Sequence, residues 1–415
     1  MDDSAIEKEP ARSRSAIGKA EFIGLTAALM ALNAMAIDIM LPGLQQIGAA
    51  LGVADENERQ FIITAYILGL GGAQLFYGPI ADRFGRRGPL LVGLAIYVAT
   101  AFAAAFASNF AALLAFRFLQ GIGAAATRVI AISAIRDTFG GRRMAEVMSM
   151  VMMVFMIIPV VAPGLGQAAM IFGDWPVIFL LMGGVSLAIT FWAATRLPET
   201  LAPEQRRSLS FQVIMEGFRF VVTDRIALCY TLASTVIFGG LFGFINSAQQ
   251  IYVDIYGLGA WFPLIFAIGA GLMAVSSFTN ARLVGRFGMR RLSHGALIGF
   301  IVVNGIWLAL SLAGPIPFLL FFVLFSVSMF QFGWMGSNFN AIAMEPLGHV
   351  AGTAAAVLGF VTTLGGGVIG AIIGQAFDGT LTPLAAGYFI VGLIGLVLVL
   401  AGERWRLFRQ VNPAV

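Results

Sequence analysis

The sequence predicts an all-α membrane protein whose 12 transmembrane helices form two pseudo-symmetric bundles of six. Three observations lead to this fold class. The chain is 59% hydrophobic and only 11% charged, whereas a soluble domain carries about 25% charged residues. It contains twelve apolar stretches long enough to cross a bilayer, and a short motif recurs at the same place in its two halves.

A spanning helix needs about 20 mostly apolar residues, and the sequence offers twelve such stretches. The predicted spans cover residues 22–42, 60–80, 89–108, 110–135, 144–172, 176–195, 226–252, 260–281, 292–313, 316–344, 353–376 and 382–402. A long polar connection follows span 6. The chain therefore divides into an N-terminal tail (1–20), a first bundle (21–196), a linker (197–224), a second bundle (225–402) and a C-terminal tail (403–415).

Basic residues orient the molecule. Of the 25 Lys and Arg residues, only Arg59, Arg117 and Arg128 lie outside the tails and the loops on the side of the termini. An excess of basic residues marks cytoplasmic segments, so we expect both termini and the linker to be cytoplasmic. No small-residue cleavage site follows the first apolar stretch, which we interpret as a retained span.

An internal repeat supports two related halves. Asp82–Arg87 follows span 2, and the similar Gly285–Arg290 follows span 8, at the same place in the second half. Parallel repeats of this kind predict a pseudo-twofold axis along the membrane normal and a binding site between the halves.

The first copy, Gly78–Arg87, resembles the loop 2–3 signature of the major facilitator superfamily. Three further segments resemble the Bcr/CflA-type drug:proton antiporters of that family: Ile37–Pro42, Arg117–Gly121 with Arg136 and Asp137, and Pro159–Gly166. The resemblance implies the major facilitator fold and a place in the bacterial cytoplasmic (inner) membrane. It also implies gating roles for Gly78, Asp82, Arg83, Gly85, Arg86, Arg87, Asp137, Pro159, Pro163 and Gly166.

Within this gating set, Asp82 is expected to face the positive end of span 11 near Thr353. Arg86 and Asp137 would complete the charge cluster, and Gly285 replaces the aspartate in the second copy. A basic loop that serves topology alone is the alternative.

Three charges lie within the spans: Asp38, Arg117 and Arg128. An ionisable group near the centre of a spanning helix costs roughly 2.5–3.5 kcal/mol and usually marks a substrate or proton pathway. Similar depths suggest that Asp38 pairs with Arg117, and these two are the predicted proton-coupling residues. Burial and a neighbouring arginine act oppositely on the protonation of a carboxyl group. A purely structural ion pair is the alternative.

Polar stripes on spans 1, 4, 7 and 10 predict a cavity between the halves. The predicted lining residues are Asn33, Asp38, Tyr66, Arg117, Gln120, Arg128, Asn246, Gln249, Gln250, Gln331, Trp334 and Asn338. Interhelical hydrogen bonding is the alternative for such stripes. Gly366, Gly370 and Gly374 predict close packing of span 11, whereas His294 and His349 are expected to be solvated at helix ends.

The sequence therefore predicts a proton-coupled exporter of drug-like molecules, with proton-coupled uptake of a metabolite or organic anion as the alternative. No Walker loop, metal-ligand cluster or catalytic set is evident, so we expect no cofactor, no metal and no enzymatic activity. The expected partners are small amphiphilic substrates, protons and membrane lipid, without nucleic acid, and the expected state is a monomer. The single cysteine, Cys229, is expected to be a packing residue.

Overall fold

The computed structural model describes residues 17–206 and 211–408, and all of its regular elements are helical. Twelve helices are long and apolar enough to span a membrane, which confirms the predicted fold class. These are α1 (Lys19–Asp38), α3 (Phe61–Phe84), α4 (Arg87–Ala105), α5 (Phe110–Thr138), α6 (Gly141–Ala169), α7 (Pro176–Arg196), α9 (Arg225–Gln249), α10 (Phe262–Phe287), α11 (Met289–Ala313), α12 (Phe318–Met344), α13 (Ala351–Gln375) and α14 (Thr382–Gly402).

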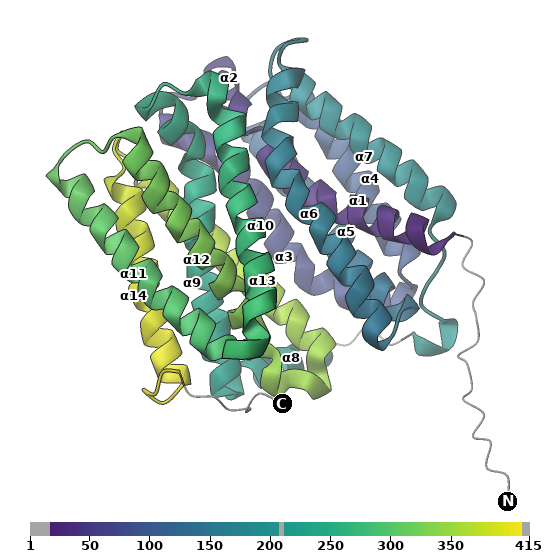
Figure 1. The fold of residues 1–415 in the computed structure, drawn as a ribbon. Helices are drawn as coiled ribbons and strands as arrows, with labels where there is room; N and C mark the ends of the chain where they lie inside the picture. The colour runs from purple at the N-terminus through teal and green to yellow at the C-terminus, as the bar shows by residue number, and fades with distance from the viewer. Residues whose placement is uncertain (1–16, 207–210, 409–415) are drawn as a thin grey trace, which may run out of the picture.

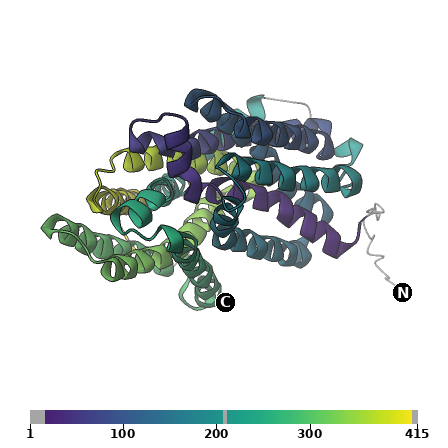
Figure 2. The ribbon, with the colours of Figure 1, turned by 90° about the horizontal axis from the view of Figure 1, so that it is seen from above.

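The two halves repeat the same helix pairings. In the first half, α3 and α4 pack on α5, α4 packs on α7, and α1 packs on α5, α6 and α7. The second half shows the corresponding pairs, with α10 and α11 on α12, α11 on α14, and α9 on α12, α13 and α14. The halves meet through α3 with α13 and through α6 with α10, two contacts that a pseudo-twofold axis exchanges. Figures 1 and 2 show the two bundles side by side.

The helix ends define two sides of the molecule. α1 begins and α14 ends on one side, here called the terminal side, and α2 (Leu44–Ala50) lies on the opposite, distal side (Figure 1). Both copies of the repeated motif lie on the terminal side. There, α3 ends at Phe84 and α10 at Phe287, each followed by a glycine with positive φ, Gly85 at +90° and Gly288 at +80°. Glycine adopts this backbone conformation without the steric cost that other residues incur.

Two local features differ from the sequence-based expectation. Span 1 was expected to continue to residue 42, but α1 ends at Asp38 and a 3₁₀ turn, Leu41–Gly43, follows. Pro42 has no N–H to donate to the carbonyl oxygen of Asp38 four residues earlier, which accounts for the end of α-helical bonding here. The linker contains a helix that the sequence did not predict, α8 (Phe211–Thr223), which packs on α13. Span 5 forms a single helix, α6, that contains Pro159 and Pro163.

The predicted close packing of span 11 is confirmed. A side chain at Gly366, Gly370 or Gly374 of α13 would meet atoms of α9, the helix that α13 packs against. Small residues at such positions let two helix backbones approach closely in a membrane.

Candidate substrate and proton site

The centre of the first half is organised around Arg117 of α5, which is fully buried. Its guanidinium donates to the carbonyl oxygens of Ala36 (2.8 Å) and Ile62 (3.3 Å) and to Oε1 of Gln120 (2.5 Å). It also lies 4.6 Å from the ring centroid of Tyr66, a favourable cation–π distance. The side chain therefore ties together α1, α3 and α5.

The predicted pairing of Arg117 with Asp38 is wrong for this conformation. The last four carbonyls of a helix have no intrahelical donor, and Ala36 lies within the last four residues of α1. Arg117 satisfies this carbonyl and places a cation at the negative end of the helix, where positive charge is stabilised. With its donors engaged by carbonyls and Gln120, the guanidinium does not require the carboxylate.

Asp38 is the last residue of α1 and is buried, at 4% exposed. Among the described residues it forms neither a hydrogen bond nor an ion pair. A glycine brings another helix close beside it, because a Cβ atom at Gly166 of α6 would collide with the carbonyl of Ile39. The sequence thus packs a carboxyl group where it has no protein counter-ion, an arrangement that is costly for a charged group.

The other predicted residues of the first half lie between Arg117 and the terminal side. Asn33 of α1 donates to Thr127 of α5 at 2.7 Å, which joins the two helices. Arg128, ten residues before the end of α5 at Thr138, is exposed and forms no ion pair within the described residues. An unpaired cation this far inside a spanning helix is expected to face a water-accessible space and not the hydrocarbon of the bilayer.

The predicted residues of the second half fall into two groups. Trp334 and Asn338 of α12 bond to α10, through Ser276 and Thr279 and through Asn280 at 2.7 Å. For these two residues the structure shows the interhelical hydrogen bonds that were the alternative interpretation.

Asn246 and Gln249 of α9 are buried. Gln249 hydrogen-bonds Asp254, whereas neither polar atom of the Asn246 amide has a partner among the described residues. Oε1 of Gln331 is likewise without a partner. The Asn246 amide and Oε1 of Gln331 therefore keep hydrogen-bonding capacity for a ligand or water.

A polar seal joins the halves on the distal side. Asn57 donates to the carbonyl oxygen of Phe377 (2.7 Å) and accepts from Gln250 (2.7 Å). Gln60 donates to Gln250 (2.6 Å), and Gln375 donates to the carbonyl oxygen of Asn57 (2.7 Å). The predicted cavity residue Gln250 is thus part of this seal. Further from the distal end, Thr363 of α13 donates to Gln74 in the middle of α3. Polar contacts thus join the halves from the distal loops to the middle of α3, so the structure is closed on the distal side.

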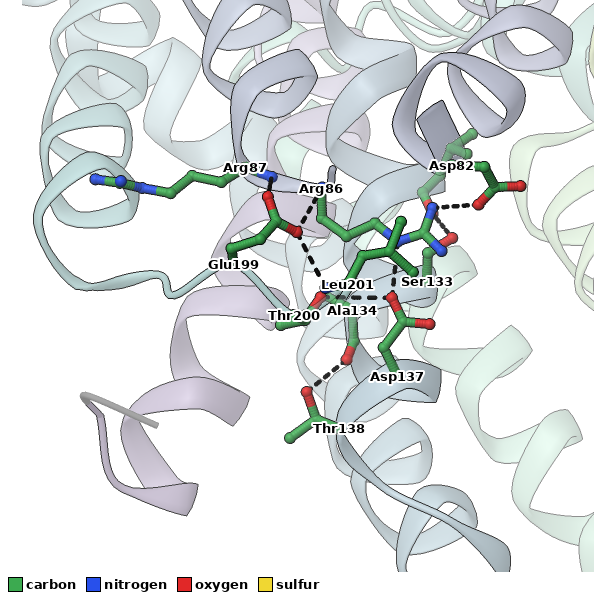
Figure 3. Close-up of polar contacts among 11 residues, drawn as sticks. Asp82, Arg86, Arg87, Ser133, Ala134, Asp137, Thr138, Glu199, Thr200 and Leu201 are labelled. Carbon is green, nitrogen blue, oxygen red and sulfur yellow. Dashed lines mark hydrogen bonds and ion pairs between the residues drawn. The ribbon is translucent and has the colours of Figure 1, made fainter. Parts of the chain in front are cut away.

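The signature loop forms a charge cluster on the terminal side (Figure 3). The buried Arg86 pairs with Asp82 at 2.6 Å and Asp137 at 2.7 Å. Burial alone lowers the pKa of Arg86, but its hydrogen bonds to the two aspartates outweigh this effect and raise it. Asp82 was expected to face the start of span 11, but here its recorded ion pair is with Arg86 in its own half.

The remaining signature residues shape the backbone around this cluster. The backbone N–H groups of Arg86 and Arg87 both donate to the Glu199 carboxylate (Figure 3). The Arg87 side chain donates to the carbonyl oxygen of Ala194. Gly78 lies in α3 with open space around its Cα, and Arg83 is exposed at the end of that helix.

A second cluster holds the terminal side of the second half. Arg290 pairs with Glu403 at 2.6 Å and with Glu345 at 2.9 Å. Tyr230 donates to Glu403 and lies 2.7 Å from Nε2 of His294, whose Nδ1 accepts the Phe408 N–H. His294 is therefore buried, which corrects the expectation of a solvated side chain. The side chain of His349 lies outside the described residues.

The sequence did not single out Glu199, Asn57, Gln60, Gln375 or Tyr230. Asn57 and Gln60 are uncharged polar residues in the distal segment just before α3, and this position could have suggested contacts between the halves on that side. The others form contacts between residues more than 100 positions apart, for which one sequence carries no local sign.

Twelve long apolar helices in two related halves, with buried polar residues near their junction, define a multi-pass membrane transporter. The chain belongs to the Major Facilitator Superfamily, whose family model matches residues 23–371. This is a family of transporters rather than of enzymes.

Characterised and uncharacterised bacterial relatives match over nearly the full chain. The chain is 30% identical over 380 residues to the uncharacterized MFS-type transporter YdgK of Bacillus subtilis, covering 90% of this chain and 92% of that protein. It is 30% identical to the bicyclomycin resistance protein homolog of Haemophilus influenzae, with 92% and 94% covered. It is 29% identical to the multidrug resistance protein MdtL of Escherichia coli, with 92% and 96% covered. The resemblance to Bcr/CflA-type proteins is confirmed.

Solved structures show the same fold. A D-xylose–proton symporter superimposes with a TM-score of 0.70 at 14% identity, covering 94% of this chain and 99% of that one. The human organic anion transporter MFSD10 superimposes with a TM-score of 0.67 at 16% identity, covering 92% and 99%. At these identities the likeness concerns the fold alone.

Proposed function

We propose that this protein exports drug-like small molecules across the bacterial cytoplasmic membrane in exchange for protons. The observation that carries the proposal is Asp38, a buried carboxyl group without a counter-ion in the described part of the chain, on a helix that Arg117 also contacts. Two of its relatives are named as resistance proteins, for bicyclomycin and for multiple drugs. No cofactor is needed, because the proton gradient supplies the free energy.

We place the terminal side in the cytoplasm, with both termini and the linker. The clustering of Lys and Arg in the terminal-side segments supports this orientation. With this orientation, the Asn57–Gln375 seal closes the external side, and the structure corresponds to an inward-facing conformation. Reporter fusions after Arg14 and Arg207 should both report cytoplasm, and an external signal from either would overturn the topology.

The proposed cycle couples the protonation of Asp38 to the partners of Arg117. In an outward-facing conformation, ionised Asp38 attracts Arg117 and takes up a proton from outside. Neutral Asp38 no longer attracts Arg117, which turns to the carbonyls of Ala36 and Ile62 as the distal side closes. Asp38 lies at the negative end of the α1 dipole, where negative charge is disfavoured. Substrate from the cytoplasm then promotes proton release and the reverse movement.

The charges of the site favour neutral or weakly anionic amphiphiles. Asp38, Arg117 and Arg128 sum to a net charge of +1 when ionised, which disfavours strongly cationic molecules. The buried amides of Asn246 and Gln331 could hydrogen-bond polar groups of such a substrate. The protein would act as a monomer, because each half supplies its part of the site within one chain.

A resistance profile tests the proposal. An efflux-deficient bacterium that expresses the chain should tolerate higher concentrations of several chemically distinct drugs, and Asp38→Asn should remove this protection at equal expression. Protection that persists in Asp38→Asn, or an unchanged profile with the wild-type chain, would contradict the proposal.

Proton-coupled uptake of an organic anion is the second candidate, and Arg128 favours it. This exposed arginine without an acid partner could bind a carboxylate between the halves. The direction of flux separates the two candidates. In right-side-out vesicles with an acidic exterior, uptake predicts accumulation of an organic anion that Arg128→Gln abolishes, whereas export predicts accumulation only in everted vesicles.

A further inference from the structure

An apolar groove runs along the outer face of the first half, between α3 and α4 with α5 as its floor. It encloses about 630 Å³. Several large apolar side chains on its walls are more than 40% exposed, and a membrane protein presents such side chains to lipid. These are Phe76, Phe84, Val92 and Phe118.

Two glycines hollow the groove. Gly69 lets α3 approach the α5 backbone at Phe118, and Gly72 has open space where a side chain would lie. The repeated motif aligns α3 with α10, since Phe84 and Phe287 both end their helices. At this alignment Leu272 and Val275 replace the two glycines. The corresponding face of the second half therefore carries side chains where the first half is hollow.

A cation lies at the terminal end of the groove. The guanidinium of Arg83 is 5.7 Å from the ring centroid of Phe84, which lines the groove. Arg83 is exposed and has no acid partner within residues 17–206 and 211–408. Two acids of the same loop region are engaged elsewhere, Asp82 by Arg86 and Glu199 by backbone N–H groups. Arg83 is therefore available to an anion from outside the protein.

The length of the groove matches one leaflet. Gly69 and Phe84 both line it and are 15 residues apart, which corresponds to about 22 Å along a helix. One leaflet with its headgroup region measures about 20–22 Å, of which about 15 Å is hydrocarbon, so an acyl chain in the groove would bring its headgroup to the level of Arg83.

We propose that this groove binds an anionic phospholipid, with one acyl chain between α3 and α4 and the phosphate on Arg83. The proposal rests on the membrane-spanning fold and not on the proposed transport function. It commits to a lipid because the described lining residues are apolar along the groove and the unpaired Arg83 lies at the depth of a headgroup.

The chain offers matched variants for a test. Arg83→Gln removes the headgroup contact. Gly72→Leu fills the groove, and Gly72→Ala fills it less, with space available for the added atoms. Arg286→Gln is the control, because Arg286 holds the same motif position and lies 5.4 Å from Phe287, but Val275 occupies the place of Gly72.

Lipid binding would be measured by native mass spectrometry of the purified full chain titrated with palmitoyl-oleoyl phosphatidylglycerol or phosphatidylcholine. We expect phosphatidylglycerol to bind more tightly to the wild type, and Arg83→Gln to weaken it about fivefold with little effect on phosphatidylcholine. Gly72→Leu should weaken both lipids, Gly72→Ala should do so less, and Arg286→Gln should resemble the wild type.

Equal effects of Arg83→Gln and Arg286→Gln would overturn the proposal, since binding would then reflect general surface charge. Unchanged lipid binding in Gly72→Leu would also overturn it. If Gly72→Leu leaves lipid binding intact but raises the KM for a transported drug, the groove is an entry for substrate instead. Failure of transport in every assay, with the lipid pattern as expected, would affect only the proposed function.

Discussion

The two halves share their helix pairings but bury different chemistry at corresponding places. Aligned from their first residues, Phe110 and Phe318, α5 and α12 place Phe325 where the first half has Arg117. Phe325 packs on Phe244 with ring centroids 4.3 Å apart and belongs to a buried aromatic cluster. The cluster also contains Phe266, Phe321, Tyr252, Phe262 and Trp307.

We propose that this difference assigns proton coupling to the first half and structural stability to the second. The Asp38 carboxyl group can gain or lose a proton, whereas Arg117 stays charged. In the proposed cycle, ionised Asp38 attracts Arg117 and neutral Asp38 does not, which gives the first half two electrostatic states. Packing of aromatic rings stabilises the folded state and does not depend on a titrating group. The aromatic cluster of the second half therefore forms a rigid apolar core against which the first half can move. We therefore expect substitutions in the first half to alter coupling and substitutions in the second half to alter stability.

The largest expected effect is that of Asp38→Asn. It should reduce pH-gradient-driven efflux in everted vesicles to the level of vesicles without the protein, while some binding of neutral ligands persists. Arg117→Ala should also be severe, and the double variant should be less than additive because both residues act in one switch. Asp254→Asn is the control, an acid on the distal side of the second half that lies 3.9 Å from Arg59. Efflux by Asp38→Asn at the rate of that control would refute the assignment.

Phe325→Ala should have the opposite profile. Removal of a buried aromatic ring lowers the free energy of unfolding by about 3–5 kcal/mol, and denaturant unfolding in micelles would measure the change. The remaining folded protein should keep its dependence on the pH gradient. A loss of coupling without a loss of stability would show that the aromatic cluster belongs to the switch.

Hydropathy and the repeated motif were sufficient to predict the twelve spans and the two halves. They missed α8 because its apolar residues lie on one side of a short helix, and a search for long apolar stretches does not detect such a pattern. They misplaced the partner of Arg117, since the free carbonyl of Ala36 follows from where α1 ends. The burial of His294 depends on Tyr230 and Phe408, which are 64 and 114 residues away.

The charge clusters around Arg86 and Arg290 allow the same comparison on the terminal side, where we expect a smaller effect on transport. Within the described residues, the side chain of Asp82 is 38% exposed and its ion pair is with Arg86. Glu345 instead belongs to a cluster that continues through Arg290 to the buried Glu403. We propose that Asp82 faces the start of α13 when the terminal side closes. Asp82→Asn would remove this contact, so it should lower transport severalfold at normal expression and shift the population toward the inward-facing state. Glu345→Gln should mainly lower stability.

Cysteine accessibility labelling on both sides would report the population. Unchanged labelling and transport in Asp82→Asn would make Asp82 a passive loop residue. A population shift of equal size in Glu345→Gln would remove the distinction between the clusters.

Gly285→Asp should have the smallest effect. It introduces the missing aspartate at the second copy of the motif, and open space surrounds Gly285. A surface substitution away from special features changes stability by about 0.5 kcal/mol or less, and transport should remain close to that of the wild type. A change as large as that of Asp82→Asn would show that the two copies are functionally equivalent.

The central claim is that Asp38 exchanges its proton when substrate binds. Proton release can be followed directly with a pH indicator in weakly buffered, purified protein, with a drug that the resistance profile identifies. We predict that the wild type and Asp254→Asn release protons in proportion to bound drug until saturation, and that Asp38→Asn binds the drug without release. Equal proton release by Asp38→Asn would contradict the account.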